Sequence, residues 1–170
     1  MSIHNEYLVL CGEGPDTRLL ESYAERLGIR ERVRFMGNLK AVTLHKFMAE
    51  ATCLIVPSEC EESVPWPLLQ MQALGKPAIV SDFGVLPDRV VDHRTGLVFG
   101  TGDAGALAQA MDEMHDMSDE ELRRLGDNAA EDARRRYEPE AYARRVLELL
   151  CGDSEFVRRR TRRHGKPNEA

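Results

Sequence analysis

The residues with the clearest chemical potential in this sequence lie at positions 57–77, in the segment PSECEESVPWPLLQMQALGKP. Three carboxylates, Glu59, Glu61 and Glu62, stand just before a predicted helix that begins with a proline pair. The helix dipole favours carboxylates at this end, so the simplest interpretation is a charged cap. Glu62 and Gln70 are eight residues apart, which is about two helical turns, and they would share one face if the helix were continuous.

The turn from Gly12 to Gly14 is a second place where the residue types allow chemistry. It follows an apolar run and precedes a predicted helix, and amide groups at a helix N-terminus bind anions such as phosphate. Taken alone, a glycine turn between a strand and a helix is more often only a turn. No serine or cysteine stands at a recognisable spacing from a histidine that would activate it as a nucleophile.

Alternating apolar and amphipathic segments determine where these groups lie. Short apolar runs predict strands at 7–10, 33–36, 53–56, 78–80 and 96–99. Helical periodicity predicts helices at 16–27, 42–51, 66–74, 87–91, 104–114, 119–136 and 138–150. We expect the leucines and methionines of these helices to form the core. The pattern predicts a doubly wound α/β domain with a parallel sheet, whose ligands bind outside the carboxyl ends of the strands.

Composition limits the class of protein. The chain has 170 residues, 23 Lys and Arg against 29 Asp and Glu, and a formal net charge of −6. These values suit one globular domain and argue against a nucleic-acid binder. The four cysteines, Cys11, Cys53, Cys60 and Cys151, form no CxxC pair. We therefore expect a cytoplasmic protein that requires neither a metal nor a cofactor.

The C-terminal end is strongly basic, with six cations in the nine residues from Arg158 to Lys166. We expect residues 1–152 to form the folded domain and residues 153–170 to form a disordered tail. The sharper alternative is a peripheral contact with an anionic membrane surface, because each cation near such a surface contributes about 1 kcal/mol of attraction.

Five sequence blocks share a characteristic order and spacing: LVLCGEGP, VRFMGNL, CLIVPSECEE, LLQMQALGKPAIVSD and LPDRVVDHRTGLVF. Together they resemble the C-terminal, donor-binding domain of the family 4 glycosyltransferases with the GT-B fold (glycosyl transferases group 1), over residues 7–150. The resemblance implies a Rossmann-like domain that binds a UDP-, GDP- or ADP-sugar. In the whole enzyme, the sugar would pass to an acceptor hydroxyl with retention of configuration.

The resemblance assigns roles to two residues of the PSECEES segment and the helix after it. Glu62 matches the first glutamate of the family motif and would contact hydroxyls of the donor sugar as the catalytic-site residue of this domain. Gln70 stands where the family has a second glutamate, which holds the nucleotide ribose. An amide can still hydrogen-bond a diol, but without the charge that strengthens such bonds.

Other positions match the donor site or depart from it. The backbone of Ser63 and Val64 matches the segment that approaches the sugar diphosphate, and Gly12 and Gly14 match glycines of the first donor-side turn. Val85 stands where the family has a glycine, so the resemblance predicts added bulk and backbone strain there.

Family members also carry segments that would precede Tyr7: another strand, a loop whose Arg and Lys hold the diphosphate, a helix, and an N-terminal acceptor-binding domain. By this resemblance the chain is a truncated domain that needs the N-terminal domain or a partner chain, and we expect it to be inactive alone. Two alternatives stay open. One is a degenerate, non-catalytic interaction or regulatory domain, and the other is a domain of a sugar-nucleotide epimerase.

Overall fold

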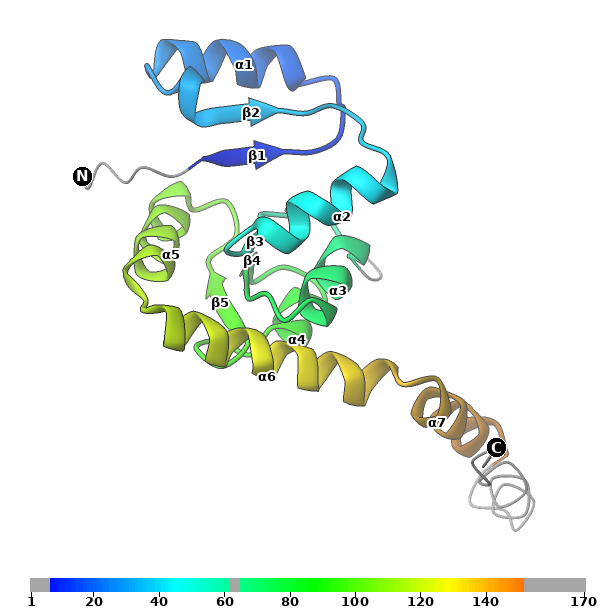
Figure 1. The fold of residues 1–170 in the computed structure, drawn as a ribbon. Coiled ribbons are helices and arrows are strands. Elements are labelled where there is room, and N and C mark those ends of the chain that lie inside the picture. Colours follow the sequence, from blue (N-terminus) through cyan, green and yellow to red (C-terminus); the bar gives the residue numbers. More distant parts are fainter. Residues whose placement is uncertain (1–6, 62–64, 152–170) are drawn as a thin grey trace. The chain divides into compact units, whose positions relative to one another are not determined.

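The computed structural model describes residues 7–61 and 65–151 (Figure 1). The described residues fall into two compact units, one up to Thr52 and one from Cys53 onward. All strands within each unit pair in parallel and alternate with helices. The predicted α/β class with parallel strands is confirmed, and the strands divide into two sheets, one in each unit. No described helix is long and apolar enough to span a membrane.

The first unit is a small βαβα arrangement. Its elements are β1 (Leu8–Leu10), α1 (Thr17–Arg26), the 3-10 helix η1 (Arg30–Arg32), β2 (Val33–Phe35) and α2 (Ala41–Glu50). β1 and β2 pair in register, with Leu8 opposite Val33 and Leu10 opposite Phe35. Among the described residues of this unit, the buried hydrophobic ones are Ala24, Val33 and Met48.

The expectation that the helical leucines form the core is wrong for α1. Leu19 is 62% exposed and Leu27 is 59% exposed, and Tyr23 between them is also exposed. The reason is the size of the unit, because a two-stranded sheet offers too little surface to cover the apolar side of a ten-residue helix.

The second unit contains a three-stranded sheet in the order β3-β4-β5. Its strands are β3 (Leu54–Val56), β4 (Ala78–Ser81) and β5 (Gly96–Phe99), and its helices are α3 (Trp66–Ala73), α4 (Leu86–Arg89), α5 (Ala104–Asp116), α6 (Asp119–Tyr137) and α7 (Pro139–Cys151). β4 is central, and all four of its residues are buried.

Alternate residues of β4 enter two different hydrophobic clusters, as expected for a parallel strand covered on both faces. Ile79 packs in a cluster with Met114 of α5 and Leu125 of α6. Ala78 and Val80 belong to the other cluster, which also includes Leu68 of α3 and Leu86 of α4. The sheet of this unit is therefore a buried core.

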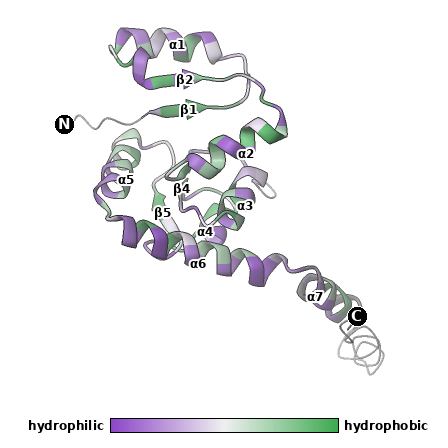
Figure 2. Ribbon diagram, in the orientation of Figure 1, coloured by the Kyte–Doolittle hydropathy of each residue, from purple (hydrophilic) through white to green (hydrophobic). Residues whose placement is uncertain are grey.

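Helix α6 is hydrophilic along most of its length (Figure 2). Its buried residues include Leu125, Ala129 and Ala133, at a spacing of four, which places them on one side of the helix. At its N-terminus, Ser118 and Glu121 form a capping box.

Helix α6 meets the chain just after α3 at a pair of glycines, Gly126 in α6 and Gly75 two residues beyond the end of α3. A Cβ atom on Gly126 would overlap the backbone carbonyl oxygen of Gly75. A backbone atom cannot move aside as a flexible side chain can, so only glycine fits at position 126. This contact sets how closely α3 and α6 pack.

We predict that Gly126→Ala lowers the free energy of unfolding by about 2 kcal/mol or more. Overpacking a tight contact costs about 1–3 kcal/mol, which outweighs the gain of about 1 kcal/mol in helix propensity. Urea unfolding followed by circular dichroism measures the change. Gly100→Ala is the control, because its Cβ would lie 4.0 Å from its nearest neighbour. Equal losses in both variants would contradict the prediction.

Candidate functional site

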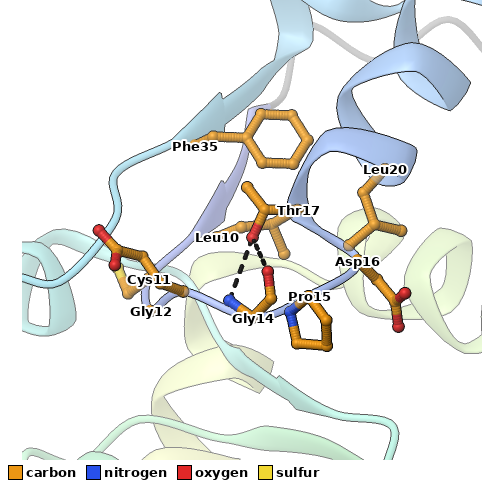
Figure 3. Close-up of a pocket in the computed structure, with 10 residues that line it drawn as sticks. Leu10, Cys11, Gly12, Gly14, Pro15, Asp16, Thr17, Leu20 and Phe35 are labelled. Atoms are coloured by element: carbon orange, nitrogen blue, oxygen red, sulfur yellow. Dashed lines mark hydrogen bonds between the residues drawn. The ribbon is translucent and has the colours of Figure 1, made fainter.

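The glycine turn of the first unit connects β1 to α1 and is closed by its own hydrogen bonds (Figure 3). The amide of Gly12 donates to the carbonyl oxygen of Gly37, at 2.8 Å. The amide of Gly14 donates to the Thr17 hydroxyl at 3.1 Å, and that hydroxyl donates to the Gly14 carbonyl at 2.9 Å. Both glycine amides therefore have acceptors within the protein, and the expected use of such amides to hold a phosphate finds no support here.

A cavity of about 280 Å³ lies beside this turn, bordered by apolar side chains that include Leu10, Leu20 and Phe35 (Figure 3). Partial burial raises the pKa of the Cys11 thiol, which also borders the cavity, so the thiol stays protonated at neutral pH. Glu13 and Asp16 also border the cavity, so its lining is unfavourable to an anion such as phosphate.

The loops after β3, β4 and β5 leave the carboxyl edge of the sheet in the second unit. Residues at the end of β4 form hydrogen bonds with the other two loops. Ser81 is fully buried, and its hydroxyl donates to the carbonyl oxygen of Ser58, after β3, at 2.7 Å. Asp82 bonds to the loop after β5. Its Oδ1 accepts from the amide of Thr101 at 2.8 Å and from the Thr101 hydroxyl at 2.6 Å.

These bonds to Thr101, first from the hydroxyl and then from the amide, lower the pKa of the Asp82 carboxyl. The amide of Asp82 also donates to the carbonyl of Phe99, at 2.9 Å. Two residues further, a Cβ on Gly84 would lie 3.9 Å from the Cα of Glu61. The loops after β3, β4 and β5 thus lie together at the carboxyl edge of the sheet. We call these loops, which include Ser58, Gly84 and Thr101, the rim.

Comparison with known proteins identifies the class. The family model described as glycosyl transferases group 1 matches residues 2–132. The chain belongs to this glycosyltransferase family. It is 31% identical, over 150 residues, to the lipopolysaccharide core biosynthesis glycosyltransferase LpsD of Rhizobium meliloti, a match that covers 87% of this chain and 42% of LpsD. The chain thus spans less than half the length of that relative.

Two solved structures illustrate the fold of this family. Sucrose-phosphate synthase from Thermosynechococcus elongatus has a TM-score of 0.73 and 28% identity, with 84% of this chain and 37% of that chain covered. Anabaena HepE in complex with UDP-glucose has a TM-score of 0.73 and 20% identity, with 85% and 40% covered, and shows the fold alone. The chain corresponds to the C-terminal half of such GT-B glycosyltransferases.

Not all of the residues that the sequence assigned to the glycosyltransferase donor site can be placed. Gly12 and Gly14 lie in the first unit, and Gln70 lies in α3 of the second. Glu62, Ser63 and Val64 lie outside the described residues, directly after Glu61 at the rim. Within residues 7–61 and 65–151, no group of three or more His, Cys, Asp or Glu residues is arranged to hold a metal ion.

The strain expected at Val85 is absent. Its backbone has φ −87° and ψ −5°, which any residue adopts, and the positive φ of 55° belongs to Gly84. Sequence reasoning gave Ser81 and Asp82 no role. The signal for them was a serine and an aspartate directly after a fully apolar strand.

We predict that Asp82 contributes stability that depends on pH. Because its pKa is lowered in the folded state, this contribution is complete above its ordinary pKa of 3.8 and is lost as the pH falls through the lower folded-state value. The stability difference between the wild type and Asp82→Ala should therefore shrink between about pH 5 and pH 2, as measured by chemical unfolding.

A double-mutant cycle assigns that contribution to the contact with Thr101. Thr101→Val removes the hydroxyl donor, so Thr101→Val combined with Asp82→Ala should cost less than the sum of the single changes. Additive losses, or a stability difference that is constant over this pH range, would contradict the assignment.

Proposed function

We propose that this chain is the donor-binding domain of a retaining glycosyltransferase, and that it binds a nucleoside diphosphate sugar. When it is joined to an N-terminal acceptor domain or a partner chain, the sugar passes to an acceptor hydroxyl. The observation that carries the proposal is the rim at the carboxyl ends of β3, β4 and β5, in a chain whose family model matches residues 2–132. Ligands of open parallel sheets bind at this edge.

The rim supports donor binding because its parts are held before a ligand arrives. Ser58, at the start of the loop that leads to Glu62, is tied to β4 by a buried hydroxyl. Thr101, after β5, is tied to Asp82. A preorganised site loses less entropy on binding, and a domain of this kind catalyses by positioning the sugar and stabilising charge on the leaving diphosphate.

Roles within the proposed site follow the resemblance, residue by residue. Glu62 contacts the sugar hydroxyls, and the backbone of Ser63 and Val64 approaches the diphosphate. Gln70 holds the ribose through its amide. Gly12 and Gly14 match glycines of the first donor-side turn.

The choice of probe comes from the fold relatives. The HepE structure with a TM-score of 0.73 holds UDP-glucose, so UDP-glucose and UDP form a matched pair of ligands that differ only in the sugar and its linkage. Calorimetric titration of the 170-residue chain with each ligand tests the proposal directly. Absence of binding to both at millimolar concentration would favour the degenerate, non-catalytic domain instead.

We predict that Glu62→Ala weakens binding of UDP-glucose about tenfold while it changes binding of UDP little. Only the sugar nucleotide carries the hydroxyls that this carboxylate contacts, and hydrogen bonds to charged groups contribute about 1.5–3 kcal/mol. Glu61→Ala is the matched control, because it removes the neighbouring acid, which is exposed. Equal losses for the two ligands, or equal effects of the two variants, would exclude the proposed role of Glu62.

We predict that a change at position 70 affects the binding of UDP and UDP-glucose equally. Gln70→Glu restores the carboxylate that the family uses on the ribose, and charge-assisted hydrogen bonds are about twice as strong as neutral ones. Binding should tighten about fivefold, equally for UDP and UDP-glucose, because both carry the ribose. Gln72→Glu is unsuitable as a control, since Gln72 is buried and its amide donates to the Arg89 carbonyl at 2.8 Å. Tightening of only one of the two ligands would contradict a ribose contact.

A further inference from the structure

We propose that Asp82 is a further binding residue of the donor site, and that one oxygen of its carboxylate accepts a hydrogen bond from a ring hydroxyl of the donor. The inference rests on the proposed function and adds a contact to it. Two rings of a nucleoside diphosphate sugar carry such hydroxyls, the transferred sugar and the ribose. The ligands UDP-glucose and UDP distinguish them, because both contain the ribose and only one contains the transferred sugar.

The Asp82 carboxylate is held in place through only one of its two oxygens. Asp82 directly follows the central strand β4, and its Oδ1 accepts from both the amide and the hydroxyl of Thr101. Its own amide donates to the carbonyl oxygen of Phe99 at 2.9 Å. Within the part of the chain that the structure describes, Oδ2 has no hydrogen-bond or ion-pair partner, and the residue is exposed. A fixed carboxylate at the carboxyl edge of the sheet therefore keeps one oxygen that can accept from a ligand.

The charge of the rim indicates which part of the donor this oxygen suits. None of the residues 57–65, 82–85 and 100–103 is Lys or Arg, whereas each of these three loops contains at least one acid. A Cβ atom on Gly102 would lie 3.8 Å from Oε1 of Glu59, so a second carboxylate lies beside the residue that follows Thr101. Carboxylates repel phosphate and accept from hydroxyl groups. The side chains of these loops therefore suit a ring hydroxyl better than the diphosphate.

The protonation state of Asp82 agrees with this role. The bonds from Thr101, first from its hydroxyl and then from its amide, lower the pKa of the Asp82 carboxyl, so the group is ionised at neutral pH. A hydrogen bond to a charged acceptor is about twice as strong as one between neutral groups.

Asp92 provides a matched control at the amino edge of the same sheet. It is also exposed, and its Oδ1 likewise accepts from a backbone amide, that of Val98, at 2.9 Å. It lies in the turn before β5, which begins at Gly96. Asp82→Asn and Asp92→Asn each replace one carboxylate by an amide of the same shape, whose oxygen can keep the bond that Oδ1 accepts.

The experiment compares the two variants with the wild type by thermal unfolding and by calorimetric affinity for UDP-glucose and UDP. We expect both variants to fold. Asp82→Asn should weaken binding about tenfold, because Thr101 retains the amide oxygen and the NH₂ group takes the place of Oδ2. Asp92→Asn should leave both affinities unchanged. A loss confined to UDP-glucose assigns the contact to the transferred sugar, and an equal loss for both ligands assigns it to the ribose.

The direction of the change separates a hydroxyl contact from a simple effect of charge. Removal of a negative charge near the diphosphate would tighten the binding of both ligands. Tightened or unchanged binding in Asp82→Asn, or an equal loss in Asp92→Asn, would therefore overturn the inference while the proposed function stands. If the wild type binds neither ligand, the proposed function fails and the inference fails with it.

A measurement on the wild type tests the contact without any substitution. In the ¹³C-labelled chain, the side-chain carboxyl resonance of Asp82 should move when UDP-glucose is added, and that of Asp92 should stay in place. An Asp82 resonance that does not move at saturating ligand would overturn the inference.

Discussion

Burial of β4 on both faces is the constraint on which the second unit depends. Its four residues lie in the middle of a parallel sheet, and Ala78, Ile79 and Val80 alternate between two hydrophobic clusters. A strand in this position must be short, apolar and continuous, so its polar residues come only at its carboxyl end. Ser81 and Asp82 are the residues at that end, and they reach the loops on either side. The position of β4 therefore determines both the packing of the core and the arrangement of the rim.

The two units differ in how completely they bury their apolar side chains. In the second unit, side chains from α3, α5 and α6 cover the sheet residues, and the glycine contact between α3 and α6 allows close approach. In the first unit the sheet has two strands, and α1 leaves several of its large apolar side chains exposed. Stability should therefore be concentrated in the unit that carries the rim, since local stability follows buried apolar contact.

Much of the fold could be predicted from the sequence because its signals are local. Apolar runs such as those at 54–56 and 78–80 are too short for helices, and the capping pair Ser118 and Glu121 marks the start of α6 without tertiary information. The exposure of Leu19 and Leu27 could not be predicted, because periodicity shows which side of a helix is apolar but not whether a partner covers it. The hydrogen bond from Ser81 to Ser58 joins residues 23 apart in the sequence and depends on strand register, which no local pattern specifies.

The proposed function requires that the carboxyl edge of β3, β4 and β5 binds a nucleotide sugar. A titration of the ¹⁵N-labelled chain with UDP-glucose, followed by two-dimensional NMR, tests it residue by residue. Donor binding at this edge should shift the amide signals of the rim, at Ser58, Gly84 and Thr101, and should leave those at the amino edge, such as Gly75 and Thr95, unchanged. A rim that shows no shifts at millimolar ligand, or shifts confined to the amino edge, would contradict it.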